Sequence, residues 1–171
     1  MDSSVSQSTL DHLARRLDEL AAEFPTRPEA VDLVTLADDI AMLSHHLQHA
    51  VERAQERFTA PATVHAPERL VLVRLARATA GMAHALDTLA EALTYATTGF
   101  QREAVPDLAH SHLRNDPQVL RMLTAEKYVA ARARLRNTAA DLRTAPPPAG
   151  PAVPRATRPP AVAQPPQRVR P

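Results

Sequence analysis

Two pairs of histidines have a spacing that suits metal binding. His45 and His49 stand four residues apart, so a helix would place both imidazoles on one face, where they can share an ion. The zincin pattern needs a glutamate directly after the first histidine, and His46 occupies that position. His110 and His112 form a second pair in a segment without clear periodicity. The first pair has no evident third ligand, whereas Asp107 accompanies the second. We interpret both pairs as polar histidines without a metal and keep a His-dependent metalloprotein as an alternative.

Other residue combinations that carry chemistry are badly spaced. Asp38 and Asp39 are adjacent and face about 100° apart on a helix, so they cannot share a proton. Ser44 precedes His45, but neighbouring helical residues do not face each other, which argues against a catalytic triad. The chain has no cysteine and no Gly-rich phosphate-binding or calcium-binding motif. We therefore expect no cofactor and favour a function without catalysis.

The elements that must position these residues are helices. Leucines and alanines recur every three or four residues, the spacing of one helix face. A capping box at Thr26 and Glu29 predicts the start of the second helix, Gly99 the end of the third, and Asp116 the start of the fourth. The apolar seam of the third helix continues to Phe100. The predicted helices cover residues 10–24, 27–59, 67–98 and 117–143.

The fold class predicted from these elements is all-α, an antiparallel up-down-up-down four-helix bundle with a short first helix and long second and third helices. The connector at 60–66 is short, which forces its flanking helices to run antiparallel. We expect a disordered N-terminus at 1–9, a bundle at 10–144 and a disordered tail at 145–171. A first helix half as long as its neighbours leaves part of a groove uncovered, so we expect a homodimer, with a self-contained monomer as the alternative.

Charge is unevenly distributed along this topology. The end where the first helix finishes collects thirteen acidic residues against five basic ones, and the opposite end collects eleven basic residues against six acidic ones. The tail adds four arginines and no acid. The arginine-rich end suggests binding to an acidic protein patch, a membrane surface or nucleic acid. The candidate partner-binding residues are Arg132, Arg134, Arg136, Arg143, Arg155, Arg158, Arg168 and Arg170.

The tail contains ten of the sixteen prolines, and its PxxP spacings suit either a spacer or a ligand for aromatic-lined grooves. Asp87 and Glu91 interrupt the most apolar stretch, which argues against a membrane span, and no secretory leader is visible, so we expect a cytoplasmic protein. The function predicted is that of a non-enzymatic interaction or adaptor protein, which associates with itself or with a protein partner. An accessory nucleic-acid-binding protein is the main alternative.

Overall fold

The computed structural model describes residues 5–104 and 116–144, and nearly all of them are helical. No strand occurs in these two ranges, so the predicted all-α class is confirmed. The long helices are α1 (Gln7–Glu23), α2 (Leu33–Phe58), α3 (Ala66–Glu103) and α4 (Pro117–Arg143). Two single 3₁₀ turns, η1 (Pro28–Ala30) and η2 (Pro61–Thr63), precede α2 and α3. The predicted disordered tail at 145–171 and the first four residues of the predicted disordered N-terminus at 1–9 lie outside the described residues, whereas residues 7–9 already belong to α1.

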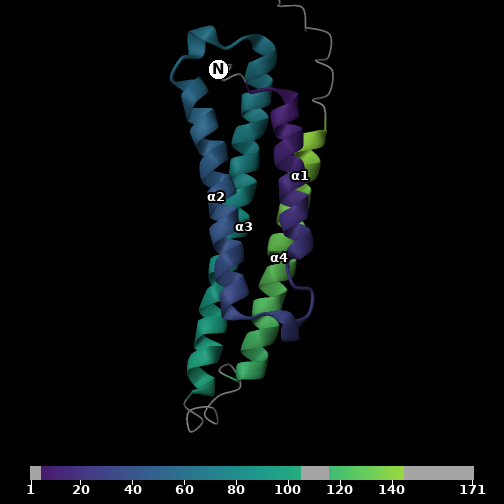
Figure 1. Cartoon of the computed structure of the whole chain (residues 1–171), viewed down its shortest axis with the longest axis vertical. Coiled ribbons are helices and arrows are strands. Elements are labelled where there is room, and N and C mark those ends of the chain that lie inside the picture. The colour runs from purple at the N-terminus through teal and green to yellow at the C-terminus, as the bar shows by residue number, and fades with distance from the viewer. Residues whose placement is uncertain (1–4, 105–115, 145–171) are drawn as a thin grey trace, which may run out of the picture.

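The helices form an elongated rod in which successive helices run in opposite directions (Figure 1). Helix α4 packs against both α1 and α3, and α2 packs against α3. Contact between α1 and α2 is marginal by comparison, although the two lie on the same side of the rod. The packing is therefore open on the side between α1 and α2.

The core is built from small and aliphatic side chains, in agreement with the leucine and alanine periodicity. Each helix contributes a leucine with no exposed surface, namely Leu17, Leu43, Leu89 and Leu135. Buried alanines on the same faces let the helix backbones approach closely. Leucine and alanine side chains have no polar atoms, so they determine which helices pair only through the fit of their shapes. Polar side chains that could bind or react stand at the positions flanking this core.

The start of α2 differs from the prediction. The capping box at Thr26 and Glu29 does not form; instead Asp32 accepts hydrogen bonds from the backbone nitrogens of Val34 and Thr35, both at 2.9 Å. A proline disfavours helical backbone in the residue before it, and Arg27, which precedes Pro28, is extended. The chain therefore makes one 3₁₀ turn before the helix begins. At α4 the predicted cap is confirmed, since Asp116 accepts from Gln118 N at 2.7 Å.

Helix α3 continues through the predicted stop at Gly99. The glycine is buried inside the helix with an ordinary negative φ, and its open surface packs beside Leu120 of α4. Phe100, which we placed on the seam, is 65% exposed. At the other end of the chain, α1 begins at Gln7 rather than residue 10, and Val5 is already buried.

Among the described residues, no helix combines the length and the apolar character that a bilayer crossing requires.

Candidate functional site: the groove between α1 and α2

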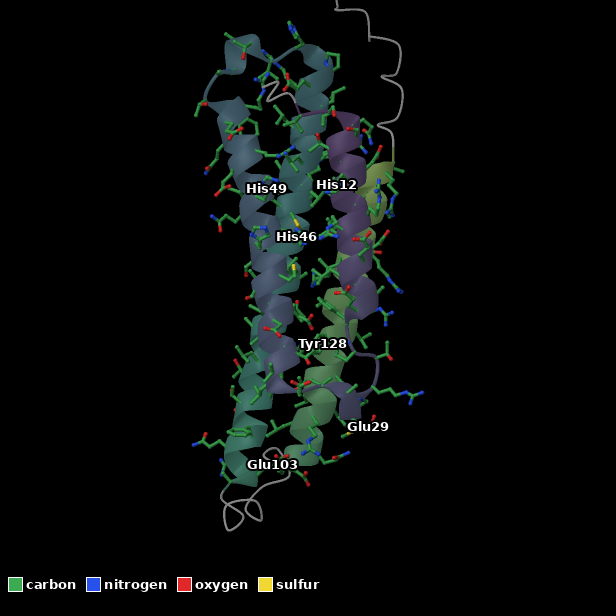
Figure 2. The ribbon with its side chains drawn as sticks, in the orientation of Figure 1. His12, Glu29, His46, His49, Glu103 and Tyr128 are labelled. Atoms are coloured by element: carbon green, nitrogen blue, oxygen red, sulfur yellow. The ribbon has the colours of Figure 1, made fainter. Side chains whose placement is uncertain are left out.

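A groove of about 580 Å³ runs between α1 and α2. Its floor is apolar and consists of Leu13 from α1, Ala50 from α2 and Leu75 from α3. Figure 2 places His12 on α1 across from the α2 histidines. The remaining lining residues are polar or basic and stand on its two rims: Ser8, Thr9, His12, Arg16, His45, His46, His49 and Arg53.

Helix periodicity explains why basic residues gather at the rims. On α1, His12 and Arg16 are four residues apart and share a face. On α2, the positions 46, 49 and 53 are separated by three and four residues and flank the buried seam that includes Ala50. Because α1 and α2 run in opposite directions, the basic stretch of one helix lies beside the basic stretch of the other.

The charged side chains lining this groove are Arg16 and Arg53, beside four histidines, and no carboxylate lines it. Partial burial lowers the pKa of His46, and Arg16 and the neighbouring histidines lower it further. Its ring lies against that of His45 with centroids 5.9 Å apart. Arg16 forms an exposed ion pair with Glu19 at 2.8 Å. With its pKa lowered, His46 stays neutral to a lower pH than an exposed imidazole does.

The groove continues toward the other end of α1 as a smaller hollow of about 100 Å³. Arg16 and His46 line both parts. Here the rims become acidic and partly apolar, with Glu19, Leu20, Glu23 and Met42 as the other lining residues. Negative charge extends onto the start of α2, where burial raises the pKa of Asp39 and the nearby carboxylates Glu23, Asp38 and Asp32 raise it further. The α1–α2 face is thus divided into a basic half and an acidic half.

The histidine pair singled out from the sequence lies on this groove, but its geometry does not favour a metal. His45 and His49 are both exposed on the α2 rim. Within 5–104 and 116–144, no three His, Cys, Asp or Glu side chains are placed to share an ion. His110 and His112 lie outside the described residues. His12, Arg16 and Arg53 also line the groove but were not predicted from the sequence, because the spacing of residues within one helix does not show which other helix they will face.

The structure does not gather the arginines predicted to bind a partner. Arg132 is half-buried on α4, whereas Arg134 and Arg136 are exposed. Arg143 is paired with Asp18 of α1 at 2.6 Å. The four tail candidates, Arg155, Arg158, Arg168 and Arg170, lie outside the described residues. The arginines that line the α1–α2 groove are Arg16 and Arg53, which were not among these candidates.

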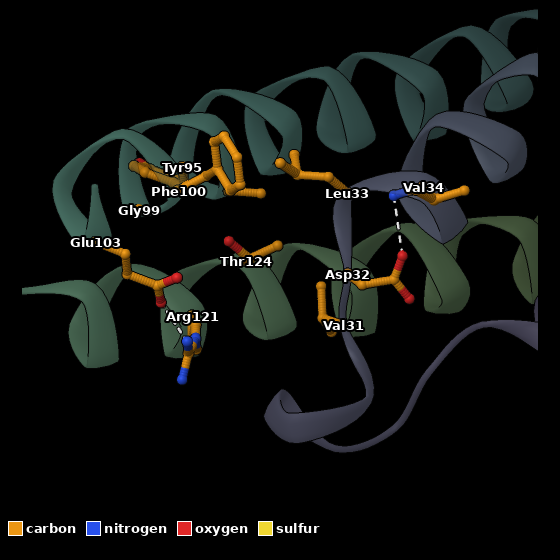
Figure 3. Close-up of a pocket in the computed structure, with 11 residues that line it drawn as sticks. Val31, Asp32, Leu33, Val34, Tyr95, Gly99, Phe100, Glu103, Arg121 and Thr124 are labelled. Carbon is orange, nitrogen blue, oxygen red and sulfur yellow. Dashed lines mark hydrogen bonds and ion pairs between the residues drawn. The ribbon is translucent and has the colours of Figure 1, made fainter.

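A second concavity, of about 330 Å³, lies where α2 begins and α3 ends (Figure 3). Its walls are mostly apolar, and Val34 and Phe100 on its rim are 72% and 65% exposed. An ion pair between Glu103 and Arg121 borders it on the α3–α4 side. Its lining thus combines exposed apolar side chains with this ion pair.

No protein-family model matches the chain, and neither curated proteins nor solved structures show a significant similarity to it.

Proposed function

We propose that this chain is a non-enzymatic interaction protein, an up-down-up-down four-helix bundle that docks a protein partner through its α1–α2 face. One observation carries the proposal: α1 and α2 lie on the same side of the rod with only marginal contact, and the groove between them has an apolar floor and charged rims. A partner helix could lay an apolar face on the floor and place charged residues on the rims.

The floor supports this mode of binding over the binding of a small ion. Leu13 keeps part of its aliphatic surface exposed at the bottom of the groove, whereas Ala50 and Leu75 beneath it are already buried. Burying such surface stabilises a complex by about 25 cal/mol per Å² before the cost of association. The rims then select the partner, because misplaced like charges weaken binding.

Site-directed cross-linking tests the proposal. The chain has no cysteine, so His49→Cys introduces a single thiol at the groove, which can carry a photoreactive maleimide. Ala133→Cys, on an exposed position of α4, is the matched control. We expect cross-linked protein adducts from position 49 and few from position 133, identified by mass spectrometry and reproduced with the purified partner. Equal yields from both positions, or none from position 49, would contradict the proposal.

A second candidate is the accessory nucleic-acid-binding function, favoured by the basic half of the face. Arg16 and Arg53 stand on opposite rims and could contact phosphates from both sides. Filter binding of single- and double-stranded DNA and RNA over a range of salt concentrations tests this candidate. Retention at about 50 mM salt that is lost in the Arg16→Gln/Arg53→Gln variant would support it, and the absence of retention would remove it.

A further inference from the structure

We propose that the partner of the α1–α2 face is a second copy of this chain, bound antiparallel about a two-fold axis. The inference rests on the proposed function, because it takes the α1–α2 face as the docking surface and names what occupies it. The observation that carries it is the division of this face into two halves of opposite charge.

The basic half is defined by His12, Arg16, His46, His49 and Arg53, which line the larger part of the groove. They come from both helices and lie close enough for Arg16, His12 and His49 to lower the pKa of His46. No carboxylate lines this part of the groove. The only ion pair of a basic-half arginine among the described residues is the exposed contact of Arg16 with Glu19, which contributes little and can exchange.

The acidic half is defined by Glu19, Glu23, Asp38 and Asp39, and it too is built from both helices. Glu19 and Glu23 line the smaller hollow on α1. Asp38 is exposed on the first half of α2, and Asp39 beside it is partly buried. Burial raises the pKa of Asp39, and the nearby carboxylates of Glu23 and Asp38 raise it further. Met42 lies between the two halves on α2 and is 48% exposed. An unbranched apolar side chain at this point can adapt to a partner surface.

The order of these charges determines the orientation of a second copy. A two-fold axis across the face, close to Met42, places the basic half of each copy on the acidic half of the other. The contact is then isologous and satisfies the same pairs twice. A copy in the parallel orientation would set arginines on arginines and carboxylates on carboxylates, which costs several kcal/mol. Electrostatic complementarity therefore favours the antiparallel arrangement alone.

The same division argues against nucleic acid as the occupant of the whole face. Phosphates attracted to Arg16 and Arg53 would continue along the groove onto Glu19 and Glu23, where like charge repels them. The apolar groove floor and Met42 also have no counterpart in a phosphate backbone. A protein surface that carries both signs of charge and some apolar area fits better, and this chain carries such a surface itself.

Charge reversal in each half tests the inference. Arg16→Glu/Arg53→Glu makes the whole face acidic, and Glu19→Lys/Glu23→Lys makes most of it basic. Arg134→Glu/Arg136→Glu on α4 is the control for the arginine variant, with the same change in net charge on two exposed residues outside the groove. Circular dichroism checks that each variant remains helical. Sedimentation equilibrium of the full-length chain then gives the dimer dissociation constant at low and moderate salt.

We expect the wild type and the α4 control to dimerise, and each groove variant alone to dimerise at least about tenfold more weakly. Mixing the two groove variants should restore a heterodimer, because an acidic face then meets a basic one. Salt should weaken the wild-type dimer by screening. A monomeric wild type, groove variants that dimerise like the wild type, or a mixture that stays monomeric would overturn the inference.

The outcome is separable from that of the proposed function. If the wild type is monomeric but position 49 cross-links a different protein and position 133 does not, the second copy is excluded and the docking face stands. If a dimer forms but neither half of the face influences it, the second copy does not use this face.

Discussion

The hydroxyl of Tyr128 donates a hydrogen bond to Asp39 Oδ2 at 2.7 Å, which joins α4 to α2 across the lower half of the rod (Figure 2). The tyrosine ring is fully buried and meets Phe24 edge-on, with centroids 5.4 Å apart and planes at 78°. Burial raises the pKa of the tyrosine hydroxyl, and the hydrogen bond to the carboxylate raises it further. One side chain thus ties the end of α1, the start of α2 and the first half of α4.

Substitutions of Tyr128 and Asp39 should separate the effect of the hydrogen bond on stability from the effect of the carboxylate charge. Tyr128→Phe leaves the Asp39 carboxylate without its donor and should lower the free energy of unfolding by about 1 kcal/mol. Asp39→Asn keeps an acceptor, removes a charge that burial and Glu23 disfavour, and should leave stability at pH 7 equal or higher. Urea denaturation followed by circular dichroism measures both.

The pH dependence of the same contact has a defined sign. Because the pKa of Asp39 is raised above its usual 3.8, the folded protein binds more protons than the unfolded chain between those two values. The contribution of Asp39 to stability is therefore full below pH 3.8 and is lost as the pH rises through the raised pKa. Asp39→Asn should flatten this part of the stability curve. An unchanged slope in the variant would show that other groups produce it.

The two helical glycines of α3 should respond oppositely to alanine. A Cβ at Gly81 would overlap the hydroxyl of Thr138 and lie 3.2 Å from its Cγ2, whereas a Cβ at Gly99 would lie 3.6 Å from Leu120 in ordinary contact. We expect Gly81→Ala to destabilise the protein by about 1–3 kcal/mol, despite its better helix propensity. Gly99→Ala should stabilise by about 0.5–1 kcal/mol. Thermal unfolding checks both, and adding Thr138→Ala should rescue the first.

A partly buried ion pair joins the end of α2 to the start of α3. Arg57 donates two hydrogen bonds to Glu68, at 2.7 and 2.9 Å, and Glu68 Oε1 also accepts from Val5 N at 3.2 Å. Glu68→Gln should lower the thermal midpoint at neutral pH because both contacts weaken. Glu19→Gln, in the exposed pair with Arg16, is the control and should change it little.

Acid should act on the same pair with the opposite sign from Asp39. The hydrogen bond from Arg57 holds the pKa of Glu68 below its usual 4.5. Stability from the pair is thus present above pH 4.5 and is lost as the pH falls through the lower folded value. In Glu68→Gln this acid-dependent loss should be absent, and its persistence there would assign it to other carboxylates.

Arg74 of α3 connects α1 to α4 at the same end of the rod as this ion pair. It donates to Gln7 Oε1 at 2.7 Å and to the carbonyl of Leu142, so it connects the start of α1 to the last turn of α4. Arg74→Met should cost about 1–3 kcal/mol, because a helix-end carbonyl loses its donor. Amide exchange should rise in the last turn of α4 and at the start of α1. Arg77→Met, exposed on the same helix, should leave both unchanged.

Helix starts were predicted correctly from the sequence where only one residue nearby could cap the helix. Asp116 caps α4 as expected because its carboxylate needs only a backbone nitrogen two residues on. The box at Thr26 and Glu29 fails because Asp32 offers a better cap after the 3₁₀ turn. The prediction that Gly99 ends the third helix was wrong, because this glycine is instead a small residue at which α3 packs against Leu120 of α4. That contact joins segments that are distant in the sequence.

The sequence alone determined that the described residues are helical, most of the residues that face inward, and roughly where each helix begins, since these depend on periodicity and on contacts a few residues long. Only the tertiary structure decided that α1 packs on α4 rather than on α2, and hence that His12 and Arg16 face His46 and Arg53 across a groove. Leucine and alanine seams are alike on all four helices, so which seams meet is settled by the combined shape of the packed side chains and by close approaches such as that of Gly81 to Thr138.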